Sequence, residues 1–592
     1  MNISNTIKFF VFGTTLFLSF AYALGQRIVA PSSFMFSNSF DAMKNYFTFY
    51  SYYLQNSGGS IFAYQGMNYP FGDSIFFTDQ TPLVSLFSKY VVPWIDPIGF
   101  YNSFFLCNIF VAGIVTFAIG NLFKFHWAVN VVFGLFLAWM NPQVLQLGGA
   151  VNLSLSAVYI GSIYLFIRDW RNVNSERNDI PLQILNLPIL ITILVSALIH
   201  LYYPVILLVF LGTGYLYGGI FQRRKEFFFS GFLTCSAAIV LVFALLYFTD
   251  GYLPIRPSSS QGYDLEAWSG NTRDWFSSYL FLDLPSFYKQ TDWSRDTIIF
   301  LGSGFVPAIL LTGIVFLLKR SRKTKAAVAG ELAPLLFGAI ICYFVSLGPT
   351  VDIFNGSVRL PNLFNPFYYL SFITDYVTHF RFTVRFGLPV FYTFTLTLFY
   401  FMNQMLKSGK FSGVLHYLVF LILGIYLFDA LQAMHFAKND FTSENVLAEE
   451  ELERIPEFDT NRFDAILPLP YYHVGSETKG FIIDDKDEWS RKTYQLSIKN
   501  RLPLMSSKMS RTPLIFTKEQ FDLLRDSPSK EMMTLLKGKH ILVAHNHSLS
   551  PKLMYGYPAD DVLRGQSSFI NKLADHFLFE QDEICYFNWE IK

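Results

Sequence analysis

Residues Phe104–Phe123 read FFLCNIFVAGIVTFAIGNLF and are directly followed by Lys124. The segment contains no Asp, Glu, Lys or Arg. At about 1.5 Å of rise per residue, a helix of this length crosses the roughly 30 Å hydrocarbon layer of a bilayer. We therefore predict a transmembrane helix here, and the basic residue after it is typical of a cytoplasmic helix end.

The composition of the whole chain indicates that this segment is one of many. Of 592 residues, 52% are hydrophobic and 15% are charged, whereas an ordinary soluble domain has about 25% charged residues. Apolar segments of comparable length recur, and we predict a mainly α-helical polytopic membrane protein with about eleven spans. The expected spans are Phe9–Leu24, Phe104–Phe123, Trp127–Leu145, Leu153–Ile167, Leu185–Ile199, Val205–Ile220, Phe227–Phe248, Ile298–Leu318, Leu332–Leu347, Leu388–Met405 and Val414–Phe428.

Net charge and cysteine content exclude several other classes of protein. A formal net charge of +1 offers no electrostatic footprint for nucleic acid, so we expect no nucleic-acid partner. Three of the four cysteines fall inside apolar runs, and Cys585 stands alone near the C-terminus. We therefore expect neither a disulfide framework nor a cysteine-based zinc site.

The distribution of Lys and Arg predicts the orientation in the membrane, because short cytoplasmic loops are enriched in basic residues. Every second connection is basic. These connections contain Lys124, then Arg168, Arg171 and Arg177, then Arg223, Arg224 and Lys225, then Lys319, Arg320, Arg322, Lys323 and Lys325, then Lys407 and Lys410. We predict a multi-pass protein of the plasma (inner) membrane with a cytoplasmic N-terminus. Outer loops 25–103, 249–297 and 348–387 and the C-terminal region would be periplasmic or extracellular.

The first apolar segment has a second interpretation. Lys8, the run Phe9–Phe20 and the small-residue pattern Ala21–Ala23 also suit a cleavable signal peptide. The orientation of everything downstream is the same under both interpretations.

The composition changes sharply after the last expected span. We predict a transmembrane domain over 1–430 and an extracytoplasmic soluble α+β domain over 431–592. Charge clusters appear in this second part, and Ala465–Leu469 and His540–Ala544 are typical of short buried strands. His545 and His547 would share one strand face, but a metal site needs a third ligand that the sequence does not identify, which favours a structural or surface role for both.

The first outer loop contains the densest group of polar residues. We predict a helix from Asp41 to about Gln55, capped by Asn38 or Ser39, and another through Ser85 and Lys89, capped by Thr78 or Asp79. Both are rich in Phe, Tyr and Leu, so we expect them to lie along the membrane interface.

This loop, together with the span layout, resembles the multi-spanning GT-C-type glycosyltransferases, in particular their bacterial members. The resemblance rests on Asp41-x-x-Lys44-Asn45-Tyr46 after the first span, and on short motifs at His200–Tyr203, Phe380–Phe386 and Leu467–Pro470. It implies an essential Asp in the first outer loop, which here is Asp41. It also implies a polyprenyl-phosphate sugar donor and a glycan, lipid or protein acceptor on the outer face, with membrane lipids as further partners.

The chemistry of glycosyl transfer points to the same residues. A carboxylate must take a proton from the acceptor hydroxyl while fixed positive charge stabilises the phosphate leaving group. Asp41 suits the first task, and we predict Asp79 as a second catalytic carboxylate. On a helix, Arg381 and Arg385 would present both guanidinium groups on one face toward phosphate oxygens. The expected substrate-binding residues are Lys44, Asn45, Asp73, His200, Arg381 and Arg385.

Alternatives exist for the residues and for the function. Asp41 could be only a helix N-terminal charge, Asp73 and Asp79 turn or cap residues, and the two arginines could reach lipid headgroups. A divalent cation shared by Asp41 and Asp79 is possible, although two carboxylates are too few to define a site. The alternative functions are a transporter or flippase of lipid-linked saccharides, and a non-catalytic membrane assembly protein.

Overall fold

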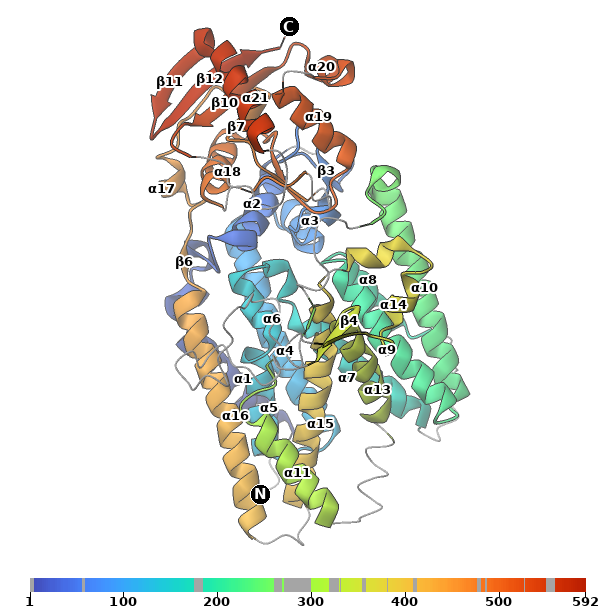
Figure 1. Ribbon diagram of the computed structural model, residues 1–592. Helices are drawn as coiled ribbons and strands as arrows, with labels where there is room; N and C mark the ends of the chain where they lie inside the picture. Colours follow the sequence, from blue (N-terminus) through green and yellow to red (C-terminus); the bar gives the residue numbers. More distant parts are fainter. Residues whose placement is uncertain are drawn as a thin grey trace.

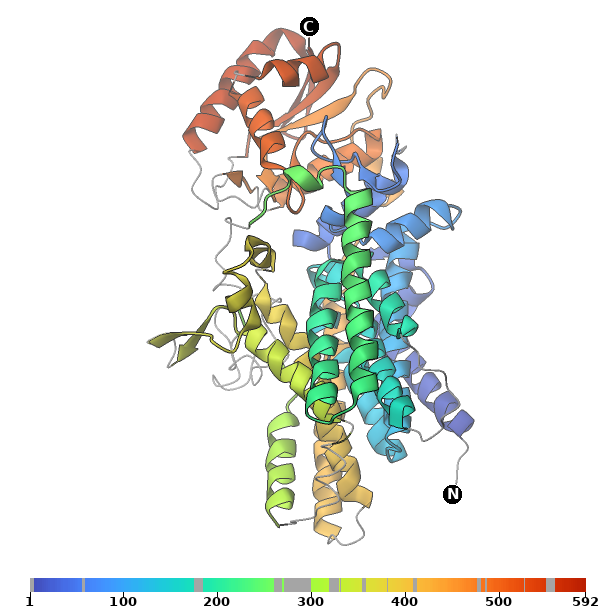
Figure 2. The same ribbon diagram turned by 90° about the vertical axis from the view of Figure 1, so that its right-hand side faces the viewer.

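A computed structural model describes most of the chain (Figure 1). The described residues are 5–55, 59–174, 185–259, 269–270, 300–318, 330, 332–353, 358–380, 382–407, 413–475, 481–484, 487–525, 528–549 and 559–591. Long helices run side by side through most of the molecule. The C-terminal α/β region after residue 440, called the tail below, lies at one end of these helices, and the N-terminus lies near the other end (Figure 2).

Within the described residues, eight helical segments are long and apolar enough to cross a membrane, and three shorter apolar helices accompany them. All eleven coincide with expected spans, which confirms the polytopic helical fold. The long helices are α1 (Asn5–Leu24), α4 (Pro97–Leu122), α5 (Trp127–Trp139, continued by α6, Pro142–Leu145), α7 (Ser156–Asn174), α9 (Tyr202–Ile220), α10 (Lys225–Thr249), α15 (Leu388–Lys407) and α16 (Gly413–Asp440). The shorter ones are α8 (Leu187–Ala197), α11 (Phe305–Leu318) and α13 (Ala333–Ser346).

Local sequence explains where several of these helices begin. Asp96 precedes α4, and its Oδ1 accepts a hydrogen bond from the Gly99 amide, while Pro97 takes the first helical position. Asn186 caps α8 in the same way through the Ile189 amide. A capping side chain satisfies an amide that has no partner inside the helix, and proline at the first turn costs no hydrogen bond.

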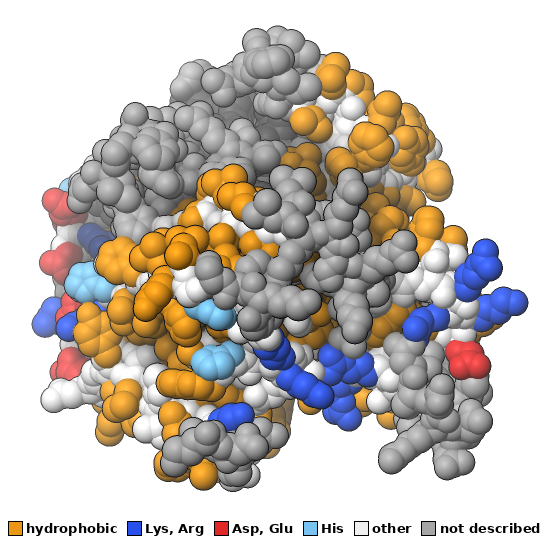
Figure 3. All heavy atoms as spheres, turned by 90° about the horizontal axis from the view of Figure 1, so that it is seen from below, with side chains coloured by type: hydrophobic (Ala, Val, Ile, Leu, Met, Phe, Trp, Pro, Cys, Tyr) orange, Lys and Arg blue, Asp and Glu red, His pale blue; other side chains and the backbone are white. Residues whose placement is uncertain are grey.

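Basic residues gather at one end of the helical bundle. Lys124, Arg171, Arg224 and Lys407 all lie at helix ends far from the tail, and Figure 3 shows Lys and Arg side chains gathered on this end of the molecule. Arg177, residues 319–325 and Lys410 lie outside the described residues. The basic loops therefore share one end of the bundle, as the alternation predicts, and the sidedness of each end stays a prediction.

Helix α1 packs into the bundle. The Phe12 side chain is fully buried, and its ring stacks on that of Phe117 in α4 with centroids 4.4 Å apart. Trp139 in α5 donates its indole N–H to Ser19 Oγ at 2.8 Å. Helix α1 thus contributes to the core through both apolar and polar contacts.

The two helices of the first outer loop form close to where they are expected. Helix α2 runs from Phe40 to Leu54 with Ser39 at its N-cap, and α3 runs from Pro82 to Tyr90. The N-cap of α3 is Thr81, so the expected cap at Thr78 or Asp79 is wrong. The residues of α2 are buried within the protein on almost every side, and its Phe47 ring stacks on Tyr494 of the tail at 4.2 Å, while the position of both helices along the membrane interface stays a prediction.

The tail is built on a four-stranded sheet in the order β11–β12–β10–β7. Strand β7 pairs parallel to β10, and the other pairs are antiparallel. The two strands expected from the sequence are confirmed as β7 and β10. The strands are β7 (Ala465–Leu469), β10 (His540–Asn546), β11 (Phe577–Gln581) and β12 (Ile584–Glu590), and the helices are α17 (Glu449–Leu452), α18 (Glu488–Asn500), α19 (Leu514–Leu524), α20 (Lys530–Leu536) and α21 (Ala559–Lys572).

Short two-stranded pairings complete the fold. Strand β1 (Phe34–Met35) pairs with β6 (Ser443–Glu444), so the first outer loop meets the chain just after α16. The remaining pairs are β2 (Ala63–Tyr64) with β3 (Asp73–Ser74), β4 (Thr350–Ile353) with β5 (Val358–Pro361), and β8 (His473–Val474) with β9 (Ser507–Lys508). The short helix α14 (Pro366–Leu370) follows β5.

The first outer loop and the tail share backbone hydrogen bonds. Asn68 and Tyr69 donate their amides to Ser506 and Leu504, the Leu504 amide donates to Gly66, and the Ser510 amide donates to the Phe77 carbonyl at 2.7 Å. Backbone pairing of this kind fixes register as well as proximity. The tail is therefore locked onto the loop that carries Asp41 and Asp79.

Candidate functional site

A cavity of about 290 Å³ lies where the helical bundle meets the tail. Its wall comes from segments far apart in the sequence: the start of α2, the loop before α3, the turns before α7 and α9, the residues His379, Phe382 and Arg385, and tail residues 474–475 and 509–511. The polar and charged side chains among them are Asp41, Lys44, Asn45, Asp79, Asn152, His200, His379, Arg385, Ser510 and Arg511. The cavity thus combines carboxylates with several basic groups.

Two carboxylates in the wall hold one ammonium group between them. Lys44 Nζ lies 2.8 Å from Asp41 Oδ1 and 2.8 Å from Asp79 Oδ2. Asp41 and Lys44 lie three residues apart at the start of α2, on neighbouring turns of one face. The Asp41 side chain is 61% exposed and that of Asp79 only 15%, so Asp41 is the carboxylate that a ligand can reach.

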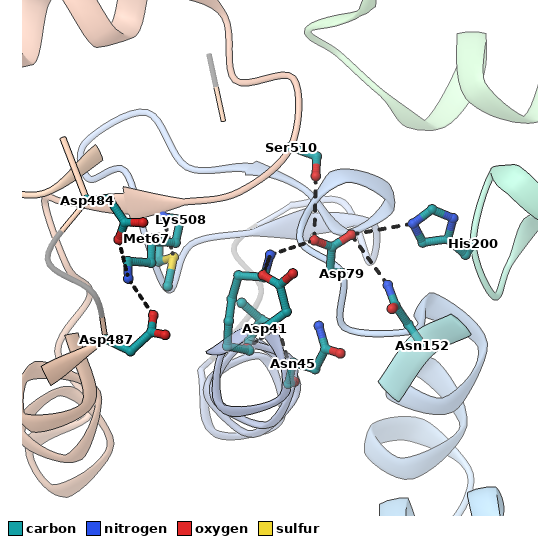
Figure 4. A network of polar contacts seen from close by, with 12 residues as sticks. Asp41, Asn45, Met67, Asp79, Asn152, His200, Asp484, Asp487, Lys508 and Ser510 are labelled. Carbon is teal, nitrogen blue, oxygen red and sulfur yellow. Dashed lines mark hydrogen bonds and ion pairs between the residues drawn. The ribbon is translucent and has the colours of Figure 1, made fainter. Parts of the chain in front are cut away.

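Asp79 is surrounded by further polar groups (Figure 4). Asn152 Nδ2 lies 3.4 Å from Oδ1 and Ser510 Oγ lies 3.5 Å from Oδ2. His200 Nε2 approaches Oδ1 to 3.6 Å, which is too long for a direct hydrogen bond. Asp79 also adopts a left-handed backbone conformation with φ of 61°, a strained geometry that is typical of functional sites.

The electrostatics of the cluster fix its protonation. Burial alone would raise the pKa of Asp79, but the Lys44 ammonium outweighs it and holds this pKa well below the usual range. Burial alone would lower the pKa of Lys44, but the two carboxylates outweigh it and raise this pKa. Burial lowers the pKa of His200 in spite of Asp79. At neutral pH, Asp79 is therefore charged, Lys44 is charged and His200 is neutral.

Asn45 has an unsatisfied amide. Its side chain is 1% exposed, it lines the cavity, and neither Oδ1 nor Nδ2 has a hydrogen-bond partner within the described part of the chain. Leaving a buried polar group unpaired costs about 1–3 kcal/mol. A group of this kind at a cavity wall is well placed to pair with a bound ligand that offers both a donor and an acceptor.

Arg385 lies at the wall, although not on the expected α-helix. It belongs to the 3-10 helix Thr383–Gly387, its guanidinium lies 4.7 Å from the Tyr202 ring centroid, and α15 begins only at Leu388. The expected α-helix is absent from residues 382–387, because Phe382 is not helical and its amide donates a hydrogen bond to Tyr202 Oη. Arg381 lies outside the described residues.

Asp73 does not reach the cavity. It is fully buried against Arg256, whose Nη2 lies 2.5 Å from Asp73 Oδ1 and whose Nε lies 2.6 Å from Asp250 Oδ2. Arg256 Nη1 also donates to the Arg511 carbonyl at 2.9 Å. The predicted role of Asp73 in substrate binding does not fit this position, since its neighbours leave no face open to a ligand. Its observed contacts join the first outer loop, the end of α10 and the tail.

Other cavity residues were not foreseen from the sequence. Asn152, Ser510 and Arg511 lie in segments without a chemical motif, and Ser510 and Arg511 come from the tail. Local patterns give no signal for them, because they reach the site only through the pairing of the tail with the first outer loop. Lys44 Nζ lies between the carboxylates of Asp41 and Asp79, where a divalent cation shared by the two would have to bind.

Fold and cavity together define a polytopic membrane protein with a charged site at the tail end of its helices. The chain belongs to the family described as "Domain of unknown function (DUF6311)", whose model matches residues 12–431. No curated protein matches. Among solved structures, the chain is similar to ArnT from Cupriavidus metallidurans in the apo state, with 10% identity, a TM-score of 0.44 and coverage of 98% of this chain and 97% of that chain.

Proposed function

We propose that the protein is a membrane glycosyltransferase of the GT-C type. In this proposal it transfers a sugar from a polyprenyl-phosphate donor to a hydroxyl group of a glycan, lipid or protein on the outer face of the membrane. The observation that carries the proposal is the cavity itself. An accessible carboxylate, fixed positive charge and an unpaired amide face one space at the end of the membrane helices.

The two carboxylates take different roles in this reaction. Asp41 is the general base, because it is exposed to the cavity and within reach of a bound hydroxyl. Asp79 positions Lys44, since its strongly lowered pKa makes it a weak base and its oxygens are already engaged. This assignment narrows the sequence prediction, which gave both carboxylates a catalytic role.

The step balances with the groups present. The acceptor oxygen forms a bond to the anomeric carbon, its proton passes to the Asp41 carboxylate, and the bond from the anomeric carbon to the phosphate oxygen breaks. Lys44 and Arg385 stabilise the negative charge that develops on the departing lipid phosphate. Asn45 pairs with a sugar hydroxyl, which is both donor and acceptor and so matches the unsatisfied amide.

A transporter fits the structure less well. Ion-coupled transport relies on ionisable groups deep within spans that can exchange partners. Asp429 in α16 is a buried ionisable group directly after the last expected span, but its carboxylate already accepts hydrogen bonds from the Ser303 amide at 2.7 Å and from Ser303 Oγ at 2.8 Å. These contacts hold the segment before α11 in place, which is a structural role.

The test measures transfer of radiolabelled sugar from a panel of polyprenyl-phosphate sugars in membranes that contain wild-type protein or Asp41→Asn at matched expression. Asp575→Asn serves as the control, because Asp575 is an exposed carboxylate elsewhere in the tail. We expect transfer by the wild type and the control, and a loss of at least about 100-fold in Asp41→Asn. If the wild type consumes no donor, or if Asp41→Asn transfers normally, the proposal fails.

A further inference from the structure

Three potential metal ligands, His547, Glu580 and Cys585, converge at the tail sheet, and His545 is paired with one of them. The residue opposite His545 of β10 is Cys585 of β12, and the residue opposite Cys585 on the other side is Glu580 of β11. His547 follows β10 two residues after His545. Because directly opposed residues share a face of a sheet, the side chains of His545, Cys585 and Glu580 belong to the same face, and His547 lies in the turn that follows β10.

The potential ligand atoms of three of these residues converge. One ligand atom each of His547, Glu580 and Cys585 lies within 4.8 Å of the other two, and within the described residues no other set of three His, Cys, Asp or Glu converges in this way. His547 Nε2 and Glu580 Oε1 are 3.0 Å apart. The backbone ladder fixes this arrangement, since β12 pairs with β10 on one side and β11 on the other (Figure 1).

The geometry is close to that of a tetrahedral zinc site. Zinc binds imidazole nitrogen, carboxylate oxygen and thiolate sulfur at about 2.0–2.3 Å, which places neighbouring ligand atoms about 3.3–3.8 Å apart. The 3.0 Å between His547 Nε2 and Glu580 Oε1, and the limit of 4.8 Å for the other two pairs of atoms, lie on either side of this separation. The combination of nitrogen, oxygen and sulfur ligands favours zinc over the hard cations magnesium and calcium, which prefer oxygen.

We propose that His547, Glu580 and Cys585 form a zinc-binding site on the tail. The fourth position is open to water or to His545, which is the next donor on the same face. This site is separate from the cavity and does not depend on the proposed transferase activity. It revises the sequence analysis, in which Cys585 stood alone and the histidines had no third ligand, because the missing partners come from a hairpin more than thirty residues downstream.

The site ties the end of β10 to the β11–β12 hairpin. His547 and Glu580 have side chains that are 47% and 51% exposed, so a metal ion can enter from solvent without opening the fold. A bound ion would link three strands, of which β11 is at the edge of the sheet. Zinc binding should therefore also stabilise the tail against unfolding, because an ion that binds only the folded state shifts the equilibrium toward it.

The experiment uses the full-length protein purified in detergent and stripped of metal. Zn²⁺ is titrated against a competing indicator dye, and a parallel titration with Co²⁺ follows the absorption band that appears when a thiolate binds cobalt. We expect one zinc per chain and a cobalt–thiolate band. Cys585→Ser should abolish the band, and Cys585→Ser, His547→Ala and Glu580→Gln should each weaken zinc binding at least about 10-fold.

His576→Ala and Cys107→Ser are the matched controls, because both positions are exposed and lie outside the cluster. Both should bind zinc as the wild type does. Elution as a single species and an unchanged metal-free unfolding temperature exclude misfolding of the variants. Absence of zinc binding by the wild type at micromolar concentration, equal affinity in Cys585→Ser and His547→Ala, or cobalt binding without a thiolate band would each overturn the proposal.

Discussion

Two clusters in this protein place a basic group between two aspartates, and they differ in exposure. In the open cluster, Lys44 lies between Asp41 and Asp79 at the wall of the cavity, and the Asp41 side chain is 61% exposed. In the sealed cluster, Arg256 lies between Asp73 and Asp250, with side chains that are 4%, 0% and 0% exposed. The two clusters therefore have different roles, although their charges are alike, because only the open cluster is accessible to a ligand.

The sealed cluster explains how the open one is assembled. Arg256 joins Asp73 of the first outer loop to Asp250 after α10, and it donates to the backbone of Arg511 in the tail. Its guanidinium also lies 3.8 Å from the ring centroid of Phe77, two residues before Asp79. The sealed cluster thus fixes both segments that bring Asp79 and Ser510 together.

The largest expected effect comes from removing the centre of the sealed cluster. Arg256→Met leaves two buried carboxylates without their partner, and we expect a loss of about 3–5 kcal/mol in stability. Thermal unfolding of the purified full-length protein measures it. Arg454→Met is the control, because Arg454 forms an exposed pair with Glu451 at 3.1 Å and should cost less than about 0.5 kcal/mol.

A triple variant sharpens this test. Replacing Arg256, Asp73 and Asp250 together by Met, Asn and Asn removes all three charges, so most of the lost stability should return. If Arg256→Met unfolds at the wild-type temperature, the cluster does not join the three regions.

The next largest effect is a loss of sugar transfer when the open cluster is changed. Lys44→Met removes the charge that faces the departing phosphate in the proposed reaction, and we expect transfer to fall by about 100- to 1,000-fold. Stability should change less than in Arg256→Met, because Asp41 stays exposed to water and only one mostly buried carboxylate, Asp79, loses its cation. Lys518→Met, on the exposed face of α19, is the control. Equal loss of stability in the two cluster variants would remove the distinction between open and sealed.

The sequence predicts these regions unequally. Span positions, β7, β10 and the start of α2 near Asp41 follow from it, because apolar length and helix capping are local properties. Other features depend on contacts between segments that are distant in the sequence. These features are the ion pair of Asp79 with Lys44, the burial of Asp73 and the position of Ser510 beside Asp79. The segment Phe380–Phe386 shows that even a local prediction can fail. The Phe382 amide donates a hydrogen bond to Tyr202 Oη, and the α-helix expected around Arg385 does not form.

Acid should destabilise the tail through the buried side chain of His473. His473 is fully buried near the junction with the first outer loop, and burial lowers its pKa from the ordinary 6.5 to about 3. The unfolded chain therefore binds a proton that the folded chain excludes. Stability should fall as the pH drops below about 6.5, by about 1.4 kcal/mol per pH unit, until the folded pKa is reached.

Thermal unfolding at pH 7.5, about 6.5 and about 5.5 measures this slope. His473→Gln removes the titrating group and should flatten it, whereas His576→Gln at an exposed position should not. Asp79 of the open cluster should stay ionised over the same range, because its pKa lies well below it. An equal slope in His473→Gln and the wild type would assign the acid sensitivity to other groups.

The smallest effect tests whether the tail takes part in the open cluster. Ser510 Oγ lies 3.5 Å from Asp79 Oδ2, a weak contact beside the stronger ion pair with Lys44 at 2.8 Å. Ser510→Ala should therefore reduce transfer only about 2- to 5-fold, which corresponds to less than about 1 kcal/mol. The Ser510 amide still donates to Phe77, so the backbone pairing survives the substitution. A loss as large as that of Lys44→Met would mean that the tail hydroxyl, rather than the ammonium group, controls the orientation of Asp79.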